Sequence, residues 1–262
     1  MNEKTYPSDL TAEEWEWITE LIPAATSGGR PRTLWRRAVL NAILYVTKGG
    51  IQWRMLPVHL PKWQSVSQAL RAWTLPGGWV SIHDTLRARV REKEARHTHP
   101  TAGWLERQSV KTTEGGGAER GVDHGKKGKG RKRPGCVETR GGFLRGMVTA
   151  AALSDQAGAR HSFQQMRGPC KKRRNVWVAG TYRGAEWTAW GKEQSPLVLE
   201  SVARAAGQKG FAVVPHRWVV ERTLAWVNHC RRLRKDDEAL PTTSETFVSV
   251  AMTRLMLKRL AA

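Results

Sequence analysis

One carboxylate, Glu221, lies inside an apolar run that begins at Pro215. Proline suits the first position of a helix, because its missing N–H would have no partner there anyway. The apolar residues that follow recur at helical spacing and predict a mostly buried helix: Trp218, Val219, Val220, Leu224, Ala225, Trp226 and Val227. Arg217 precedes Glu221 by four residues and falls on the same face. A carboxylate in such surroundings needs a partner, so the pattern predicts either an Arg217–Glu221 pair or a metal ligand.

The charge of the chain points to a polyanionic partner. Lysine and arginine number 44 against 23 acidic residues, which gives a formal charge of +21 over 262 residues. Such a field favours nucleic acid, and double-stranded DNA is the expected partner. A basic membrane-surface protein would need an amphipathic basic helix or a lipidation motif, and the sequence shows neither. We therefore expect no membrane association.

A basic, glycine-rich segment at 115–133 could supply contacts to such a partner. Between Arg120 and Arg133 it holds seven basic residues, the other five being Lys126, Lys127, Lys129, Arg131 and Lys132. A flexible solvated loop would have the same composition. The run lies between strand signals, which favours a clamp that follows phosphates, with glycine allowing close backbone approach. We expect DNA contacts from Lys111, Lys126, Lys127, Lys129, Arg131, Lys132, Arg133, Arg217 and Arg222.

Metal-binding patterns based on histidine or cysteine are weak. His97 and His99 stand in a linker at 96–100, where solvated side chains are the simpler interpretation. Cys136, Cys170 and Cys230 are far apart and odd in number, which indicates neither a zinc site nor a disulfide framework. A reducing, cytoplasmic setting is expected.

The first 96 residues read as four helices. Thr11 to Glu14 forms a capping box, and Pro23 is expected to end that helix before a basic turn over 26–32. Further helices are expected over 34–45, 65–73 and 79–94, with a short aromatic loop over 53–57. Short helices joined by basic turns fit a helix-turn-helix-like DNA-binding module, although a helical bundle with a solvated basic face would look the same.

The second half, residues 101–262, reads as an α/β domain with one mixed sheet. Strands are expected over 102–108, 136–139 and 143–151, the last two forming a hairpin around Arg140-Gly141-Gly142. Helices are expected over 157–166 and 243–260. Three more strands are expected over 175–179, 196–201 and 211–214.

Several motifs now resemble, in order, the DDE transposases of bacterial insertion sequences of the insertion-sequence-five type. They cover nearly the whole chain: 6–11 (YPSDLT), 29–32 (GRPR), 52–57 (QWRMLP), 108–113 (QSVKTT), 130–133 (GRKR) and 217–223 (RWVVERT). The resemblance implies a small all-α DNA-binding domain over 1–96 and an RNase H-like catalytic domain over 101–262. It also implies two Mg2+ ions held by an Asp-Asp-Glu triad, a homo-oligomer on DNA, and a nucleoid-associated bacterial protein.

Carried over residue by residue, the implied triad is incomplete. Glu221 matches the third acid, and Glu106 stands where the family has its first Asp, as both a catalytic and a metal-binding candidate. The second Asp position is Ala179, which has no ligand atom. Glu138 and Asp155 are read as ordinary surface or turn carboxylates. Two hypotheses follow: an insertion-sequence transposase that cuts and joins DNA at terminal inverted repeats, or a catalytically inactive relative that only binds DNA, as a decayed copy or a repressor.

Overall fold

The structure is a computed structural model that describes residues 6–23, 35–75, 77–114, 117–167, 174–179, 182, 184–194, 197–202 and 217–262. Within it the chain forms two compact units, the first made of 1–98, 227–234 and 246–262, and the second of 99–226 and 235–245. The basic turn over 26–32, the GRPR motif, the strand expected over 211–214, Pro215 and Cys170 lie outside the described residues. None of the helices described is long and apolar enough to cross a membrane.

The first unit is helical, as its sequence predicts. Its N-terminal part comprises α1 (Ala12–Ile18), α2 (Arg36–Gly49), the 3-10 helix η1 (Trp53–Met55), α3 (Trp63–Thr74) and α4 (Gly78–Lys93). The expected capping box is confirmed, since Thr11 and Glu14 each accept a hydrogen bond from the other's backbone N–H. The aromatic loop contains η1, and α1 ends five residues before Pro23.

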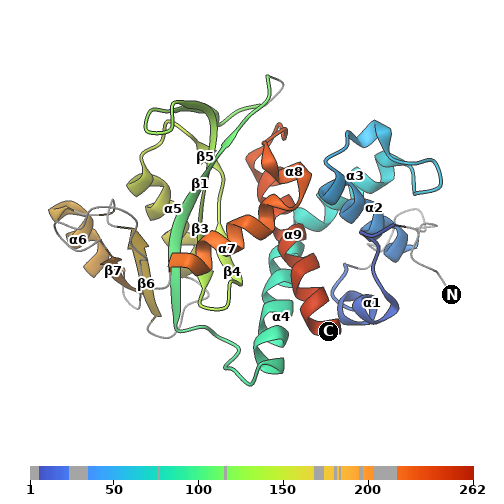
Figure 1. Ribbon diagram of the computed structural model, residues 1–262, viewed down its shortest axis with the longest axis horizontal. Helices are drawn as coiled ribbons and strands as arrows, with labels where there is room; N and C mark the ends of the chain where they lie inside the picture. Colours follow the sequence, from blue (N-terminus) through green and yellow to red (C-terminus); the bar gives the residue numbers. More distant parts are fainter. Residues whose placement is uncertain are drawn as a thin grey trace. The chain divides into compact units, whose positions relative to one another are not determined.

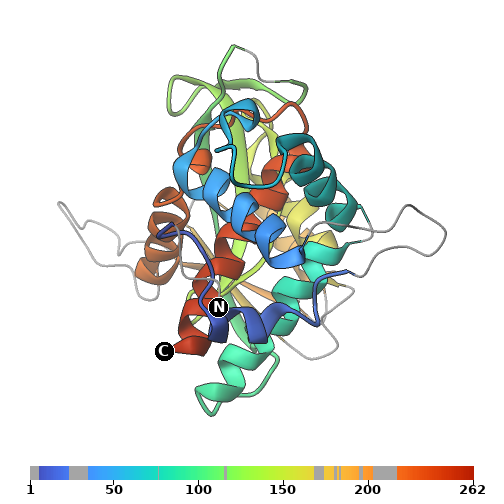
Figure 2. The same cartoon turned by 90° about the vertical axis from the view of Figure 1, so that its right-hand side faces the viewer.

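The C-terminal segments also belong to the first unit. They include α8 (Arg231–Arg234) and most of α9 (Pro241–Ala261). Figures 1 and 2 both show α9 beside α4, and the Lys93 ammonium donates to the carbonyl of Leu260 at 2.9 Å. Arg254 of α9 forms an ion pair with Glu14 of α1. The boundary of a separate domain over 101–262 stays a prediction.

The second unit is built on a seven-stranded mixed sheet with the order β2-β3-β1-β6-β7, with β4 and β5 pairing β3. The strands are β1 (Ala102–Lys111), β2 (Gly121–Asp123), β3 (Gly128–Glu138), β4 (Phe143–Gly146), β5 (Thr149–Ala150), β6 (Arg174–Ala179) and β7 (Leu197–Val202). β1 runs antiparallel to β3 and parallel to β6, and β6 runs parallel to β7. The expected mixed sheet and its β3–β4 hairpin are confirmed.

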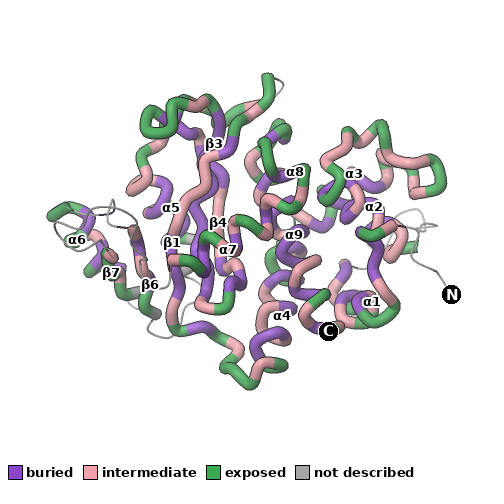
Figure 3. Tube along the Cα trace, viewed as in Figure 1, coloured by how far each residue is buried: buried purple, intermediate pink, exposed green. Residues whose placement is uncertain are grey.

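Helices cover both faces of this sheet (Figure 1). Leu105 packs with residues of α5 (Asp155–Arg167) and α6 (Ala185–Lys192), a helix that the sequence reading missed. The adjacent Trp104 packs with α7 (Arg217–Asn228). Because neighbouring residues of a strand point to opposite faces, α5 and α7 lie on opposite sides of β1. Figure 3 shows buried residues concentrated along β3, although its first residues belong to the segment 115–133 that was expected to be a basic, phosphate-binding loop.

Candidate active site

Two of the three predicted triad positions lie on neighbouring parallel strands. The register of β1 and β6 pairs Leu105 with Val178. Glu106 and Ala179 are the next residue on each strand, and Ala179 is the last residue of β6. The carboxyl ends of parallel strands are a usual position for functional side chains in α/β sheets. The structure therefore puts Glu106 next to a position that carries only a methyl group.

Helix α7 is held against the same region by packing and by two hydrogen bonds. Val219 and Val220 pack on Trp104 of β1. The Thr223 hydroxyl donates to the carbonyl of Gly141 at 3.1 Å, and the Arg222 guanidinium donates to that of Arg140 at 3.2 Å. The β3–β4 turn thus fixes the helix at the two residues that follow Glu221.

The side chain of Arg217 brings Glu106 and Glu221 together. Its guanidinium is 3.2 Å from Glu221 Oε1 and 3.6 Å from Glu106 Oε2. The predicted pair between Arg217 and Glu221 is therefore present. The predicted burial is wrong, because the Glu221 side chain is 61% exposed while that of Glu106 is 15% exposed. Two carboxylates from remote segments share one cation, an arrangement that a positively charged ligand could also satisfy.

Trp218 departs from the expected burial as well. It is 53% exposed, and Arg222 lies between its ring and that of Trp226, at 4.5 and 4.6 Å from the two ring centroids. Arg222, expected to contact DNA, is thus held by two aromatic faces and a carbonyl.

On the opposite face of β1, Arg107 joins two carboxylates that the sequence reading did not assign to the site. Its guanidinium is 2.5 Å from Asp155 and 3.1 Å from Asp123. Asp155 also pairs with Lys132 at 3.0 Å, so it is more than an ordinary turn carboxylate. Glu138, the other acid read as ordinary, is buried and accepts a hydrogen bond from the Gly142 amide. Glu106 and Arg107 are neighbours on β1, and neighbouring strand residues point to opposite faces. This is the signal in the local sequence that Glu106 and Arg107 meet different partners.

The electrostatics of this face follow from its hydrogen bonds. Burial alone would raise the pKa of Asp123, but the Ser109 hydroxyl, the Lys126 amide and the charges of Arg107 and Lys132 lower that pKa to about 2. Asp123 is therefore ionised at neutral pH and ties the β2–β3 hairpin to β1.

The phenol of Tyr182 has the opposite shift. Burial raises its pKa well above the usual range, and the negative charges of Asp155 and Glu106 raise it further. The hydroxyl remains protonated at neutral pH, within the electrostatic influence of Glu106 and Asp155. It can therefore serve only as a neutral hydrogen-bonding group.

The basic segment is divided by the structure into exposed and buried cations. Lys111, Lys126, Lys127 and Lys129 are exposed. The expectation that Arg131, Lys132 and Arg133 contact DNA is wrong in this structure, since their exposed fractions are 0%, 8% and 6%. They lie in β3, and each side chain is engaged by an internal carboxylate. The basic residues of the segment that stay exposed are Lys126 and Lys127 in the β2–β3 turn, Lys129 at the start of β3, and Arg120 before β2.

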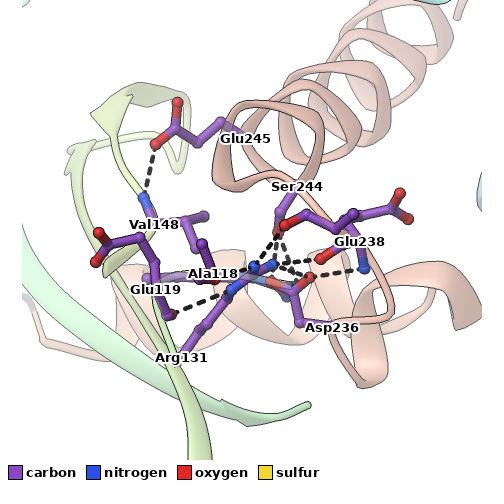
Figure 4. A network of polar contacts seen from close by, with 10 residues as sticks. Ala118, Glu119, Arg131, Val148, Asp236, Glu238, Ser244 and Glu245 are labelled. Carbon is purple, nitrogen blue, oxygen red and sulfur yellow. Dashed lines mark hydrogen bonds and ion pairs between the residues drawn. The ribbon is translucent and has the colours of Figure 1, made fainter. Parts of the chain in front are cut away.

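The most buried of these ion pairs joins Arg131 to Asp236, both 0% exposed at the side chain, at 3.0 Å (Figure 4). Arg131 also donates to the carbonyls of Ala118, Glu119, Glu238 and Ala239. Asp236 accepts a further hydrogen bond from the Ser244 hydroxyl at 2.6 Å and pairs with Arg133 at 3.3 Å. This network fastens β3 to the segment before α9.

A divalent metal fits these residues poorly. Glu106 and Glu221 offer two carboxylates, while Ala179 offers no ligand atom, and Arg217 already lies between the two acids. Over the described ranges, no group of three or more His, Cys, Asp or Glu side chains is placed to hold a metal ion. The residues present therefore do not form a complete ligand set for Mg2+.

Two transposase families match successive parts of the chain. Residues 97–256 match the family "Transposase DDE domain", and residues 10–83 match the family "Putative transposase of IS4/5 family". The chain is 39% identical over 87 residues to the "Insertion element IS402 uncharacterized 16.2 kDa protein" of Burkholderia cepacia, covering 30% of this chain and 58% of that protein. It is 35% identical over 65 residues to "Uncharacterized protein y4sN" of Sinorhizobium fredii, covering 24% and 51% of the two chains. The alignments thus span a little over half of each relative, and no solved structure matches.

Proposed function

Because the chain belongs to the DDE transposases of the IS4/5 type, we propose that it binds the terminal inverted repeats of an insertion sequence and catalyses DNA cleavage and strand transfer there. The fold class expected from the sequence, a helical region followed by an RNase H-like mixed α/β domain, is confirmed by the DDE match and the mixed sheet. Partner and chemistry are inferred from the family and from the charge of +21. We propose a homo-oligomer on DNA in a bacterial nucleoid.

The observation that supports the site is the convergence of Glu106 and Glu221 on one guanidinium, beside Ala179. In phosphodiester cleavage an oxygen nucleophile attacks phosphorus in line, and charge develops on the attacking and leaving oxygens. DDE transposase domains generally use divalent metal ions, which supply that stabilisation when bound. In this chain, the role of Glu106 and Glu221 is to concentrate negative charge beside the carboxyl end of β6, and that of Arg217 is to neutralise it.

A second function is favoured by Ala179, where the family pattern has an Asp. Loss of one metal ligand commonly costs orders of magnitude in activity. The chain would then bind the ends of its element without cutting them, as a decayed copy or a repressor. Binding of the ends is expected under both functions, and cleavage under one.

The deciding experiment uses a supercoiled plasmid that carries the DNA flanking the coding sequence. The full chain, Ala179→Asp, and Ala179→Asp with Glu106→Asp are compared for nicking with Mg2+ and with EDTA. We expect binding by all three and a gain of Mg2+-dependent nicking on restoring Asp at 179. Glu221→Gln in the Ala179→Asp background is the control and should abolish the gain while sparing binding.

Two results would count against the proposal. Absence of binding by every variant would overturn the function itself. Binding without any gain in the doubly substituted chain would show that the catalytic position was misplaced. Nicking by the unaltered chain with Mg2+ but not with EDTA would reject the inactive alternative.

A further inference from the structure

Helix α3 has an exposed polar face with no internal role. Gln64, Gln68 and Arg71 are exposed and follow each other at intervals of four and three residues, which places them on one face. The opposite face carries Val66, Leu70 and Trp73, all buried. The helix is therefore anchored on one side and free to contact a partner on the other.

These three polar side chains are uncommitted within the part of the chain that the structure describes. None of the three side chains makes a hydrogen bond or an ion pair to the described residues. The hydrogen bonds of Gln64 and Arg71 involve only their backbone groups. Close by on the N-terminal side, Lys62 and Arg54 are also exposed. Two amides and one guanidinium thus face solvent on α3, with Lys62 just before the helix and Arg54 of η1 stacked over the Trp63 ring at 5.8 Å.

The neighbouring helices offer no comparable face. The exposed residues of α1 include Glu13 and Glu16, whose charge would repel phosphates. On α2, the guanidinium of Arg36 donates to the carbonyl of Ile22 and that of Arg37 donates to the carbonyl of Leu10. Neither helix combines free donors with positive charge.

The cations of α4 are likewise engaged. Arg87 pairs with Asp84 at 2.7 Å. Arg89 donates to the carbonyl of Trp17, Arg91 to that of His97, and Lys93 to that of Leu260. Among the described helices of the first unit that have eight residues or more, α3 alone presents amides and a guanidinium together without internal partners.

We propose that α3 is the helix that reads base sequence in the major groove of duplex DNA, through Gln64, Gln68 and Arg71. This inference rests on the proposed function and adds which helix recognises the end. The amide of glutamine can pair with the N6 and N7 edge of adenine, and the guanidinium of arginine with O6 and N7 of guanine. The twelve residues of α3 extend about 18 Å, and a major groove about 12 Å wide admits one helix. Lys62 and Arg54 would contact phosphates beside the groove.

The test begins with selection by the full chain from a pool of duplexes with a randomised centre. The sequence enriched by the unaltered chain becomes the probe, and a scrambled duplex of the same composition measures non-specific binding. Gln64→Ala, Gln68→Ala, Arg71→Ala and the triple variant are then compared at one salt concentration. Lys258→Ala, exposed on α9, matches the charge change, and Ser81→Ala, exposed on α4, is the uncharged control.

We expect each α3 substitution to lower the preference for the selected duplex over the scrambled one by roughly 5- to 150-fold. Each should also relax selection at one or two adjacent base pairs, while both controls keep the original preference. If the triple variant enriches the same sequence and keeps the same preference for it, α3 is not the reading helix, while the proposed binding of the element's ends would stand. If the unaltered chain enriches no sequence, sequence-specific end binding fails first and the role of α3 fails with it.

Discussion

The Thr223 hydroxyl shares its hydrogen between the carbonyl of Gly141, 3.1 Å away, and that of Val219, 2.9 Å away, and so ties α7 to the β3–β4 turn two residues after Glu221. Thr223 is fully buried, so losing the donor would leave that carbonyl without it. We expect Thr223→Val to lower the free energy of unfolding by about 1–3 kcal/mol, whereas Thr223→Ser, which keeps the hydroxyl, should cost less. Chemical denaturation of the three chains measures the difference. Equal stability of the Val and Ser variants would show that the hydrogen bond contributes nothing.

The close approach of α7 to the β3–β4 turn requires glycine at position 141. Its φ is +88°, and an added Cβ would lie 2.8 Å from the Trp226 ring and 2.9 Å from the Thr223 hydroxyl oxygen. We expect Gly141→Ala to destabilise the fold by about 1–3 kcal/mol through backbone strain, with further loss from the clash. Gly128→Ala is the matched control, because its nearest heavy atom is 3.8 Å away. A thermal unfolding midpoint equal in both variants would contradict this account of the turn.

The buried Arg131–Asp236 pair predicts a larger effect. Asp236→Ala would leave Arg131 and Arg133 buried without their shared carboxylate. We expect a loss of about 3–5 kcal/mol in the free energy of unfolding. The control is Glu186→Ala, which breaks an ion pair whose carboxylate is 83% exposed and should cost at most about 1 kcal/mol. Similar losses in the two variants would show that burial of the network does not matter.

The same network explains why the N-terminal part of β3, before residue 136, was missed in the sequence. Gly128 to Arg133 consists only of Gly, Lys and Arg, a composition typical of solvated loops. The acid that neutralises Arg131 is Asp236, 105 residues away, and no local pattern reveals such a partner. Helices with clear apolar periodicity and caps were predicted well, because their signals are local: α3 was expected over 65–73 and spans Trp63–Thr74.

The candidate site shows the same division. The Arg217–Glu221 pair could be predicted from a spacing of four residues on a helix. The approach of Arg217 to Glu106 depends on how α7 packs on β1, through Val219, Val220 and Trp104, and therefore on the tertiary fold. The exposure of Trp218 and Glu221 was not predictable either, because periodicity gives the width of an apolar face and not what covers it.

The low pKa of Asp123 predicts a specific response to acid. Its folded-state pKa of about 2 lies below the ordinary value of 3.8, so its ionised form stabilises the fold above pH 4. That contribution is lost as the pH falls from about 4 through 2. We expect Asp123→Asn to be less stable than the unaltered chain at pH 7, and the difference to shrink below pH 4. Urea denaturation at several pH values measures it; a difference independent of pH would mean that Asp123 does not titrate as described.

Binding to duplex DNA should depend steeply on salt, and the slope should identify the cations involved. Each neutralised phosphate contributes about −0.9 to the log–log slope of affinity against salt. Replacing the exposed Lys126, Lys127 and Lys129 of the β2–β3 hairpin by Ala should therefore make the slope shallower by up to about 2.7. Lys192→Ala, exposed on α6, is the control and should leave the slope unchanged.

Lys132 separates this contact role from a structural one. Its ammonium lies 3.0 Å from Asp155 and donates to the carbonyl of Leu153, so Lys132→Ala should lower stability without changing the salt slope. A slope near zero for the unaltered chain would exclude any phosphate-binding role for the hairpin. If the slope becomes shallower with Lys132→Ala but not with the triple substitution, the DNA lies on the sheet. Lys132 would then contact DNA, contrary to its burial in the structure.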